Sequence, residues 1–392
     1  MKILIIGYGA IGSVLVKLLM REQVVEKIYC LDLKFFEKID DKKVHFEIFD
    51  VLEKEKFANY LKEVKPDIVI NASIPKFNTY IMELCLEAKV NYMDAASLMD
   101  LDNDLDAKFP YKMEQLDYHD EFKKQNLVGL FCAGVAPGLD NMFVAEAVSE
   151  LDEIDYIKIR MVEDTGSKEM FFSWNKDWLL DEIGSKPIIY DNGKVSFVQS
   201  FGAEEEFEFP EPIGKKKTYY FCQDEVRSIP LYIKTKKLDV KIYDNNIEIS
   251  KLLFDLGLVS NETVNVDGVE VKPIQILSTL LPNPVPGEEK KFPNSIFAFA
   301  VEVIGKKNNK NTVVRYSIVF PNQKTIGEME FGANFISYPT ALSMKLFVMI
   351  FDKIKKRGVF PPEALDKETR TLIIQELPKN QVKVYKEIYT PK

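Results

Sequence analysis

A glycine-rich turn near the start of the chain constrains the fold more than any other feature. An apolar strand predicted over 2–6 runs directly into the sequence GYGAIG at residues 7–12, and a segment of helical periodicity, 13–20, follows it. A second apolar strand over 28–31 then ends at Asp32. A strand, a GxGxxG turn, a helix and a second strand ending in an acidic residue predict a βαβ unit of the dinucleotide-binding type.

Each residue type in this turn has a physical task in holding a dinucleotide. Gly7 permits the tight turn, Gly9 lets the backbone approach a pyrophosphate, and Gly12 lets the helix pack closely on the strand. The helix N-terminus adds free N–H groups and partial positive charge, which attract phosphate. The whole turn is therefore expected to bind the cofactor: Gly7, Tyr8, Gly9, Ala10, Ile11 and Gly12.

Asp32 predicts which dinucleotide is bound. A carboxylate at the end of the second strand accepts hydrogen bonds from the ribose 2′-OH and repels a 2′-phosphate, so the expected cofactor is NAD rather than NADP. Lys34 lies nearby in the sequence and weakens this preference. The alternative for Asp32 is an ordinary carboxylate in a surface turn.

The alternation of strands and helices continues to about residue 138. Strands are expected over 44–49, 68–71, 92–93 and 127–133, and helices over 53–64, 79–88 and 111–125. This order predicts a doubly wound parallel sheet, which binds ligands beyond the carboxyl ends of its strands. Asn71, Ala72, Ser73 and Gly134 lie at such ends and are expected to contact the cofactor. For Asn71 and Ser73 the alternative is that they only cap the next helix.

Two further residues at strand ends, Asp94 and Cys132, are candidate catalytic residues. Asp94 could orient a substrate ammonium group or relay a proton, or it could be a helix N-cap. Cys132 could line the site or be a buried apolar packing residue. Asp140 and Asn141 open a helix directly after the glycine turn at 134–138, so capping is their expected role.

The pattern changes to that of an α+β domain after residue 138. A helix is expected over 141–150, strands over 154–162, 217–221 and 240–242, and a hairpin from strands 295–304 and 313–320. Trp174 is a candidate wall against the aliphatic chain of a substrate, or a core residue of this domain. Glu225 and Arg227 could bind the two charged ends of an amino acid, or could be a solvated surface pair.

Composition excludes several classes of function. Lys and Arg number 52 against 61 Asp and Glu, a net charge of −9, so the chain carries no overall positive field for nucleic acid. The four cysteines form no CxxC pair, which indicates neither a zinc site nor disulfides and favours a reduced, cytoplasmic protein. No apolar stretch is long enough to span a membrane. The two histidines leave little material for a Ser-His-Asp unit or a metal site, and no metal is expected.

Several landmarks spread over most of the chain resemble the saccharopine dehydrogenase family. They are GYGAIG at 7–12, the turn at 71–75, AGVAPGLDN at 133–141, FSW at 172–174 with DNGK at 191–194, and GVFPPE at 358–363. The turn at 133–138 is the most specific, because it joins the cofactor and substrate domains in that family. The stretch 234–273 is similar to lysine 6-dehydrogenases, whereas 107–112 is similar to carboxynorspermidine dehydrogenases.

This resemblance implies a domain organisation and a reaction. A Rossmann domain over 1–138 would be completed by 330–365, an inserted α+β domain over 139–329 would bind substrate and form a homodimer, and 366–392 would be a tail. The implied activity is NAD(P)-dependent hydride transfer at the CH–NH carbon of an amino-acid substrate of the saccharopine type, through an imine. Alternatives are oxidative deamination of lysine and dehydrogenation of a polyamine carboxylate.

One departure from the family pattern bears on the substrate. Saccharopine reductases usually carry an Arg-Tyr-x-Gly stretch where this chain has Lys236–Val240, and that arginine helps to hold a substrate carboxylate. Saccharopine itself is therefore in doubt, and a small amino-acid or polyamine substrate is expected. A dinucleotide-binding sensor without turnover is the alternative from a different functional class.

Overall fold

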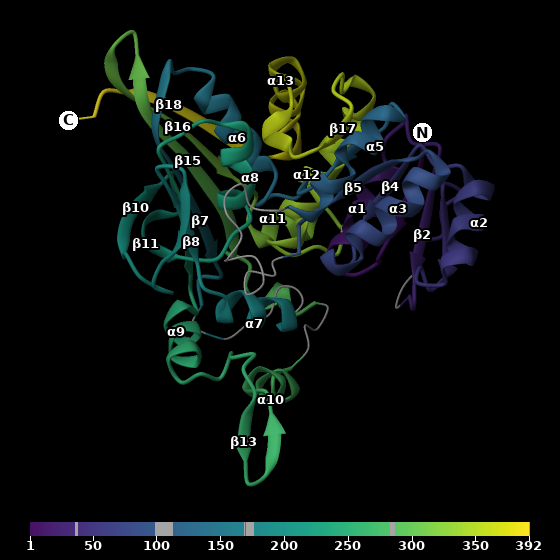
Figure 1. Ribbon diagram of the computed structural model, residues 1–392, viewed down its shortest axis with the longest axis horizontal. Coiled ribbons are helices and arrows are strands. Elements are labelled where there is room, and N and C mark those ends of the chain that lie inside the picture. Colours follow the sequence, from purple (N-terminus) through teal and green to yellow (C-terminus); the bar gives the residue numbers. More distant parts are fainter. Residues whose placement is uncertain (36–37, 99–112, 168, 170–175, 283–286, 392) are drawn as a thin grey trace. The chain divides into compact units, whose positions relative to one another are not determined.

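The computed structural model describes the chain except for residues 36–37, 99–112, 168, 170–175, 283–286 and 392 (Figure 1). The chain forms two compact units. The first unit comprises Met1–Glu146, Arg227–Ile233 and Ser337–Lys379, and the second comprises Ala147–Val226, Lys234–Ile336 and Asn380–Lys392.

The first unit is built on a seven-stranded sheet whose neighbouring strands all pair in parallel. Its order is β17-β6-β5-β4-β1-β2-β3. The strands are β1 (Lys2–Ile6), β2 (Lys27–Asp32), β3 (Val44–Ile48), β4 (Ile68–Asn71), β5 (Asn91–Asp94), β6 (Val128–Leu130) and β17 (Gly358–Phe360). From β1 the strands are added first toward one edge of the sheet, as β2 and β3, and then toward the other edge, beginning with β4. This switch between β1 and β4 creates the ligand crevice of a doubly wound fold. The predicted fold class is confirmed.

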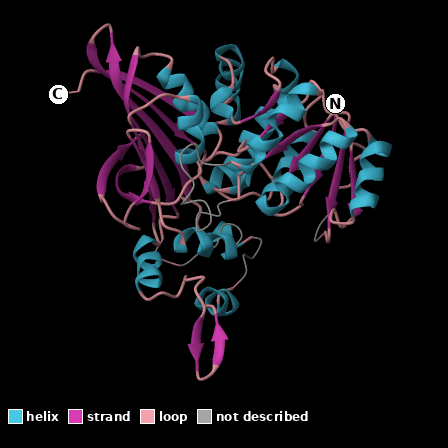
Figure 2. Ribbon diagram, viewed as in Figure 1, coloured by secondary structure: helices cyan, strands magenta, loops and turns pink. Residues whose placement is uncertain are grey.

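Helices flank this sheet in the pattern expected of repeated βα units (Figure 2). They are α1 (Ala10–Met20), α2 (Lys54–Val64), α3 (Asn78–Ala88), α5 (His119–Lys124), α12 (Ser337–Met349) and α13 (Lys367–Glu376). Helix α1 packs against α12, and α2 packs against α3. The helix predicted over 111–125 is wrong in part, because its described residues begin with the 3₁₀ segment η2 (Glu114–Tyr118) before α5.

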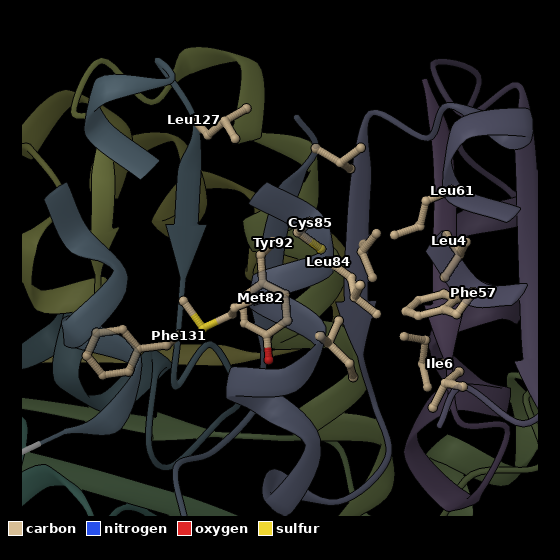
Figure 3. Close-up of a cluster of buried hydrophobic side chains, with 14 of the residues drawn as sticks. Leu4, Ile6, Phe57, Leu61, Met82, Leu84, Cys85, Tyr92, Leu127 and Phe131 are labelled. Atoms are coloured by element: carbon tan, nitrogen blue, oxygen red, sulfur yellow. The ribbon is translucent and has the colours of Figure 1, made fainter. Parts of the chain in front are cut away.

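A dense apolar core holds the sheet to α2 and α3. Figure 3 shows Leu4 of β1 beside Phe57 and Leu61 of α2, and Met82 of α3 beside Tyr92 of β5. All five side chains are at most 1% exposed. Strand β1 is buried at its last four positions, as expected of a parallel strand covered on both faces. This packing fixes the positions of the strand ends that carry the candidate site.

The second unit is built on a mixed sheet of nine strands, ordered β10-β11-β12-β7-β15-β16-β18 with β8 and β9 branching from β12. Its strands are β7 (Glu153–Asp164), β8 (Ile188–Asp191), β9 (Lys194–Phe197), β10 (Glu205–Phe209), β11 (Gly214–Tyr220), β12 (Lys237–Asp244), β15 (Ile296–Lys307), β16 (Lys310–Val319) and β18 (Lys383–Tyr389). A separate hairpin joins β13 (Val264–Val266) to β14 (Val269–Val271). The predicted hairpin of β15 and β16 is confirmed.

Helices and short 3₁₀ segments complete the two units. Those not yet given are α6 (Leu139–Val148), α7 (Lys176–Gly184), α8 (Glu225–Tyr232), α9 (Ile247–Asp255), α10 (Pro273–Leu280), α11 (Gln323–Glu328), η1 (Pro75–Phe77), η3 (Glu288–Lys291), η4 (Phe351–Lys353), η5 (Pro362–Ala364) and η6 (Pro378–Asn380). Most of α8 belongs to the first unit, which the sequence did not lead us to expect.

The structure corrects the prediction of a C-terminal tail over 366–392. Helix α13 belongs to the first unit, and β18 pairs antiparallel with β16 in the second. Strand β18 lies at the edge of its sheet, and six of its seven residues are exposed. Its sequence, KVYKEIY, mixes charged with apolar and aromatic residues without the strict alternation of a half-buried strand, which is why it was not recognised as one.

Within the described ranges, no helix is both long and apolar enough to cross a membrane. The four cysteines are buried, and none of them forms a disulfide with another described cysteine. Across the same ranges, no three His, Cys, Asp or Glu side chains are grouped as metal ligands.

Candidate dinucleotide and substrate site

The glycine-rich turn between β1 and α1 is packed too tightly for larger residues at two positions. Gly7 has φ +97°, and a Cβ there would lie 2.8 Å from the backbone nitrogen of Ser73. A Cβ on Gly12 would lie 2.0 Å from the Gly7 carbonyl oxygen. The turn therefore closes on both the helix and the β4 turn, with Gly7 against the backbone of Ala72 and Ser73.

Gly9, by contrast, faces open space. No described atom lies within 4 Å of the position that a Cβ on Gly9 would occupy. Gly9 is the N-cap of α1, no side chain of the described chain caps this end, and the first turn contains no acidic residue. The N–H groups and partial positive charge at this end are thus available to a phosphate, so the residues present fit a dinucleotide.

The carboxylate of Asp32, predicted to bind the ribose of the cofactor, is hydrogen-bonded to the glycine-rich turn. Its Oδ2 accepts a 2.6 Å hydrogen bond from the backbone N–H of Tyr8, and its Oδ1 accepts one of 3.2 Å from the N–H of Lys34. The Tyr8 ring packs against Phe35 and Phe46, with ring centroids 5.5 and 5.0 Å away. The half-buried carboxylate at the end of β2 therefore has a defined orientation.

Asn71 organises the turn after β4 rather than facing outward. Its Nδ2 donates to Asn78 Oδ1 at 2.7 Å and to the Ile74 carbonyl at 3.2 Å, and its Oδ1 accepts from the N–H of Ser73 at 3.0 Å. The N-cap residues of η1 and α3 are Ile74 and Phe77, so Asn71 and Ser73 are not the helix caps of the alternative interpretation. Ser73 is exposed, whereas Asn71 is 3% exposed and supports the turn from behind.

Asp94 lies at the end of β5 with both carboxylate oxygens engaged. Oδ1 accepts from the backbone N–H of Cys132 at 2.8 Å, and Oδ2 accepts from Nε2 of Gln115 at 3.3 Å. Its side chain is buried, and this burial raises its pKa to about 7 despite the hydrogen bonds. Its N-cap alternative is not observed, because the carboxylate bonds across the sheet to the chain after β6.

The structure brings Asp94 and Cys132, predicted separately, into one buried network. Cys132 is fully buried, has φ +51°, and places Sγ 3.2 Å from Oγ of Ser97. Ser97 Oγ also donates to Oε1 of Gln115 at 3.0 Å. No role was predicted for Gln115 or Ser97, because no local pattern joins them to β5 and β6. The full burial of Cys132 agrees with the alternative interpretation, in which it is a packing residue.

Gly134 is a packing position of the next turn. A Cβ there would lie 2.9 Å from the Ala95 carbonyl oxygen, so glycine is needed for the turns after β5 and β6 to meet. Asp140 and Asn141 hold the same turn, since the N–H of Gly138 donates to Oδ1 of Asp140 at 2.9 Å and to Oδ1 of Asn141 at 3.0 Å.

Helix α8 carries two of the predicted substrate-binding residues. Glu225 is fully buried and Arg227 is 1% exposed, so the alternative of a solvated surface pair is wrong. The guanidinium of Arg227 donates to the Leu98 carbonyl at 3.1 Å. Trp174, the third predicted residue, lies outside the described residues.

A small pocket within the second unit is lined by three carboxylates: Glu163 on β7, Glu182 on α7 and Asp244 on β12. None of the three forms an ion pair with any described residue. Burial, with repulsion from Asp244, raises the pKa of Glu163 to about 8. Burial and neighbouring carboxylates raise the pKa of Glu182 well above its ordinary value, and burial raises that of Asp244. At neutral pH Glu163 and Glu182 are therefore mainly protonated, and a cation bound beside them would favour their ionised forms.

Comparison with known proteins gives matches along nearly the whole chain. Residues 3–130 match the model of the saccharopine dehydrogenase NADP binding domain, and 134–382 match that of the saccharopine dehydrogenase C-terminal domain. A carboxynorspermidine synthase of Vibrio alginolyticus is 32% identical over 78% of this chain and 74% of its own. A carboxyaminopropylagmatine dehydrogenase of Synechocystis is 26% identical over 93% of each chain.

A solved structure supports the same fold. Saccharopine dehydrogenase (L-Glu forming) of Saccharomyces cerevisiae superposes with a TM-score of 0.68 over 99% of this chain and 100% of its own, at 12% sequence identity. The two family models and the curated relatives confirm the resemblance inferred from the landmark residues. The chain belongs to the saccharopine dehydrogenase family, whose members are nicotinamide-dependent oxidoreductases acting on CH–NH bonds.

Proposed function

We propose that this protein is an NAD-dependent dehydrogenase that forms or oxidises the secondary amine of a carboxyalkyl polyamine. The names of the two relatives suggest this substrate class. The geometric observation that favours it over a tricarboxylic substrate is the pocket of Glu163, Glu182 and Asp244. An ammonium group bound beside these carboxyl groups would stabilise their ionised forms, whereas a substrate carboxylate would gain no counter-charge there, so the pocket favours an ammonium group.

The residues that would hold the cofactor belong to the first unit. Gly7, Gly9 and Gly12 with the N-terminus of α1 would receive the pyrophosphate, and Asp32 would bind the adenosine ribose. When bound, the cofactor supplies the carbon that accepts or donates the hydride. The family model's name refers to NADP, but the fixed carboxylate of Asp32 supports NAD, because it would repel a 2′-phosphate. Titration with NADH and NADPH by nucleotide fluorescence tests this choice.

Five residues are proposed to serve the substrate side. Asp94 and Cys132, with their shared network, would shape the nicotinamide end and exclude water from it. Arg227 would bind the carboxylate of the substrate. In saccharopine reductases the arginine of the Arg-Tyr-x-Gly stretch has this role, and this chain lacks that arginine. Trp174 is proposed as a wall of the substrate site, and Glu225, at the start of α8, as a partner for a substrate amine.

The function is tested by substrate choice in the wild-type protein. With NAD, we expect NADH absorbance to rise with carboxynorspermidine or carboxyaminopropylagmatine and to rise far less with saccharopine or lysine. Preference for saccharopine or lysine would overturn the substrate class. Tight NADH binding with no turnover of any amine would favour the sensor alternative.

A charge-neutral variant tests the pocket. Glu163→Gln should raise the KM for the polyamine substrate about tenfold or more, because the variant loses a carboxyl group that would ionise against the bound ammonium, with little change in kcat. Glu262→Gln, at an exposed position of the same unit, is the matched control. An unchanged KM in Glu163→Gln would remove the pocket from the proposal.

We also propose a cytoplasmic homodimer. Four free cysteines are consistent with a reducing compartment, and light scattering of the purified protein tests the dimer.

A further inference from the structure

Glu363 is a carboxyl group at the ligand-binding edge of the first unit's sheet. It follows β17, and β17 runs parallel to β6. The loop after β17 and the turn after β6 therefore leave the sheet at the same edge, which is also the edge of the glycine-rich turn. A doubly wound sheet binds its ligands at this edge.

The carboxyl group of Glu363 is buried without a hydrogen-bond partner. Glu363 is 4% exposed, and neither Oε1 nor Oε2 receives a hydrogen bond of acceptable geometry from the described residues. Asp94, at the same edge, has both oxygens engaged. Leaving a buried polar group unpaired costs about 1–3 kcal/mol, and more if the group is charged. An unpaired carboxyl group therefore needs an explanation beyond stability.

Two polar neighbours connect Glu363 to the turn after β6. Asn141 donates from Nδ2 to Oγ of Ser228 at 3.0 Å instead of to the carboxyl group. Oδ1 of Asn141 accepts from the N–H of Gly138. Because Oγ of Ser228 accepts a hydrogen bond from Asn141, its own O–H can point toward Glu363. The carboxyl group thus faces a short polar path that ends at the turn 134–138.

The charged and titratable groups around Glu363 come from three segments. Asp140 at the start of α6 opposes its ionisation. Lys356, before β17, favours ionisation but forms no ion pair within the described chain, and its ammonium lies 5.0 Å from the ring centroid of Tyr232 on α8 and 4.9 Å from that of Phe360. Burial and Asp140 outweigh the favourable contacts of the two polar neighbours and raise the pKa of Glu363 to about 7. Both protonation states are therefore accessible near neutral pH.

We propose that Glu363 is the group that exchanges a proton with the substrate amine, an assignment that rests on the proposed function. In oxidation, an N–H proton of the secondary ammonium passes to the carboxylate of Glu363 and leaves a neutral amine. The α carbon then loses its hydride to the nicotinamide, and the nitrogen lone pair forms the C=N bond of the iminium. Reduction runs these steps in reverse, and Glu363 returns the proton to nitrogen.

Three variants test this assignment. Glu363→Gln keeps the shape but cannot exchange the proton, Glu363→Asp keeps the carboxyl group, and Glu368→Gln alters an exposed carboxylate on α13 as the control. Infrared difference spectra between about pH 6 and pH 8 should show C=O stretches of protonated buried carboxyl groups in the wild type. Glu363→Gln should lose one component of this band, while the components from Asp94 and Glu163 remain. This readout does not depend on turnover.

The second readout is the pH profile of kcat/KM for oxidation of carboxynorspermidine. Wild type, Glu363→Asp and Glu368→Gln should show a limb near neutral pH, and Glu363→Gln should lose this limb and about a hundredfold or more of its rate. A limb that persists in Glu363→Gln would overturn the assignment of Glu363 but not the proposed function. Absence of turnover in the wild type with every amine would overturn the proposed function, and the assignment with it.

Discussion

The backbone N–H of Tyr8 donates a 2.6 Å hydrogen bond to Oδ2 of Asp32. This contact joins the glycine-rich turn after β1 to the end of β2, and Oδ1 of the same carboxylate accepts from the N–H of Lys34. The carboxylate is therefore oriented before any ligand binds, which lowers the cost of ordering it around a ribose.

Replacement of Asp32 should change the choice of cofactor. A hydrogen bond to a charged group contributes about 1.5–3 kcal/mol, so Asp32→Ala should weaken NADH binding about ten- to hundredfold. NADPH binding should weaken less or improve, because the carboxylate no longer repels the 2′-phosphate. Fluorescence titration measures both affinities. Asp120→Ala, at an exposed position of α5, is the control. Equal losses for both cofactors would contradict the assigned role of Asp32.

Two glycines of the same turn should separate folding from binding. Gly12→Ala would place a Cβ 2.0 Å from the Gly7 carbonyl, and we expect it to cost about 1–3 kcal/mol and several degrees in Tm. Gly9→Ala has space for its methyl group and should keep the wild-type Tm, but it should weaken NADH binding because the backbone approach is blocked. Thermal melts and nucleotide titration check both. An unaltered NADH affinity in Gly9→Ala would exclude a pyrophosphate at this position.

Asp94 should make the stability of the protein depend on pH. The folded state holds the proton of this carboxyl group up to about pH 7, whereas the unfolded chain releases it near pH 3.8, its ordinary pKa. The folded state thus binds more protons between these values, so Asp94 lowers the free energy of unfolding as the pH rises through this window, with no further change above it. Asp94→Asn should therefore show a smaller fall in Tm between about pH 5 and pH 8 than the wild type.

The control for this prediction is Asp120→Asn, at an exposed position of α5, which should follow the wild-type curve. If Asp94→Asn and the wild type lose the same Tm over this range, the proton is not held by Asp94.

The two histidines should differ in their effect on stability. Nδ1 of His119 lies 2.7 Å from the carbonyl oxygen of Val359, and its ring fills the space that a Cβ on Gly358 would need. His119→Ala should therefore cost about 1–2 kcal/mol of unfolding free energy by loosening α5 from β17, with no effect on NADH affinity. The side chain of His45 is 52% exposed, and His45→Ala should leave the Tm unchanged. Denaturant unfolding measures both, and equal stabilities would refute the prediction.

Arg160 should be the most sensitive charged residue of the second unit. It is fully buried and contacts Oδ1 of Asp239 at 2.6 Å and Oε2 of Glu205 at 2.7 Å. Arg160→Met would leave these carboxylates without their main cation and should cost about 3–5 kcal/mol. The exposed pair of Lys215 and Glu206 provides the control, because Lys215→Met should have no measurable effect on denaturant unfolding. Comparable curves for the two variants would show that the buried network is not needed.

Much of the first unit could be predicted from the sequence because its signals are local. The glycine spacing, the apolar strand lengths and the acidic residue after β2 lie within a few turns of chain, and each has one favoured backbone arrangement. The β15–β16 hairpin was also visible as two apolar runs, 295–304 and 313–320, although both strands extend further toward the loop than predicted. The edge strand β18 was not, because its apolar and polar residues do not alternate as they do in a strand with one buried face.

The amino-acid sequence by itself determined the βαβ unit, the class of cofactor and the family, since these depend on residue type at fixed spacing. Only the tertiary structure decided which polar groups share a site. Asp94, Gln115 and Cys132 meet because parallel strands end at one edge of a sheet, and Ser228 and Glu363 reach the turn after β6 from distant parts of the chain. Burial then sets whether a carboxyl group such as Glu363 is charged, and burial is a property of packing that no short stretch of sequence contains.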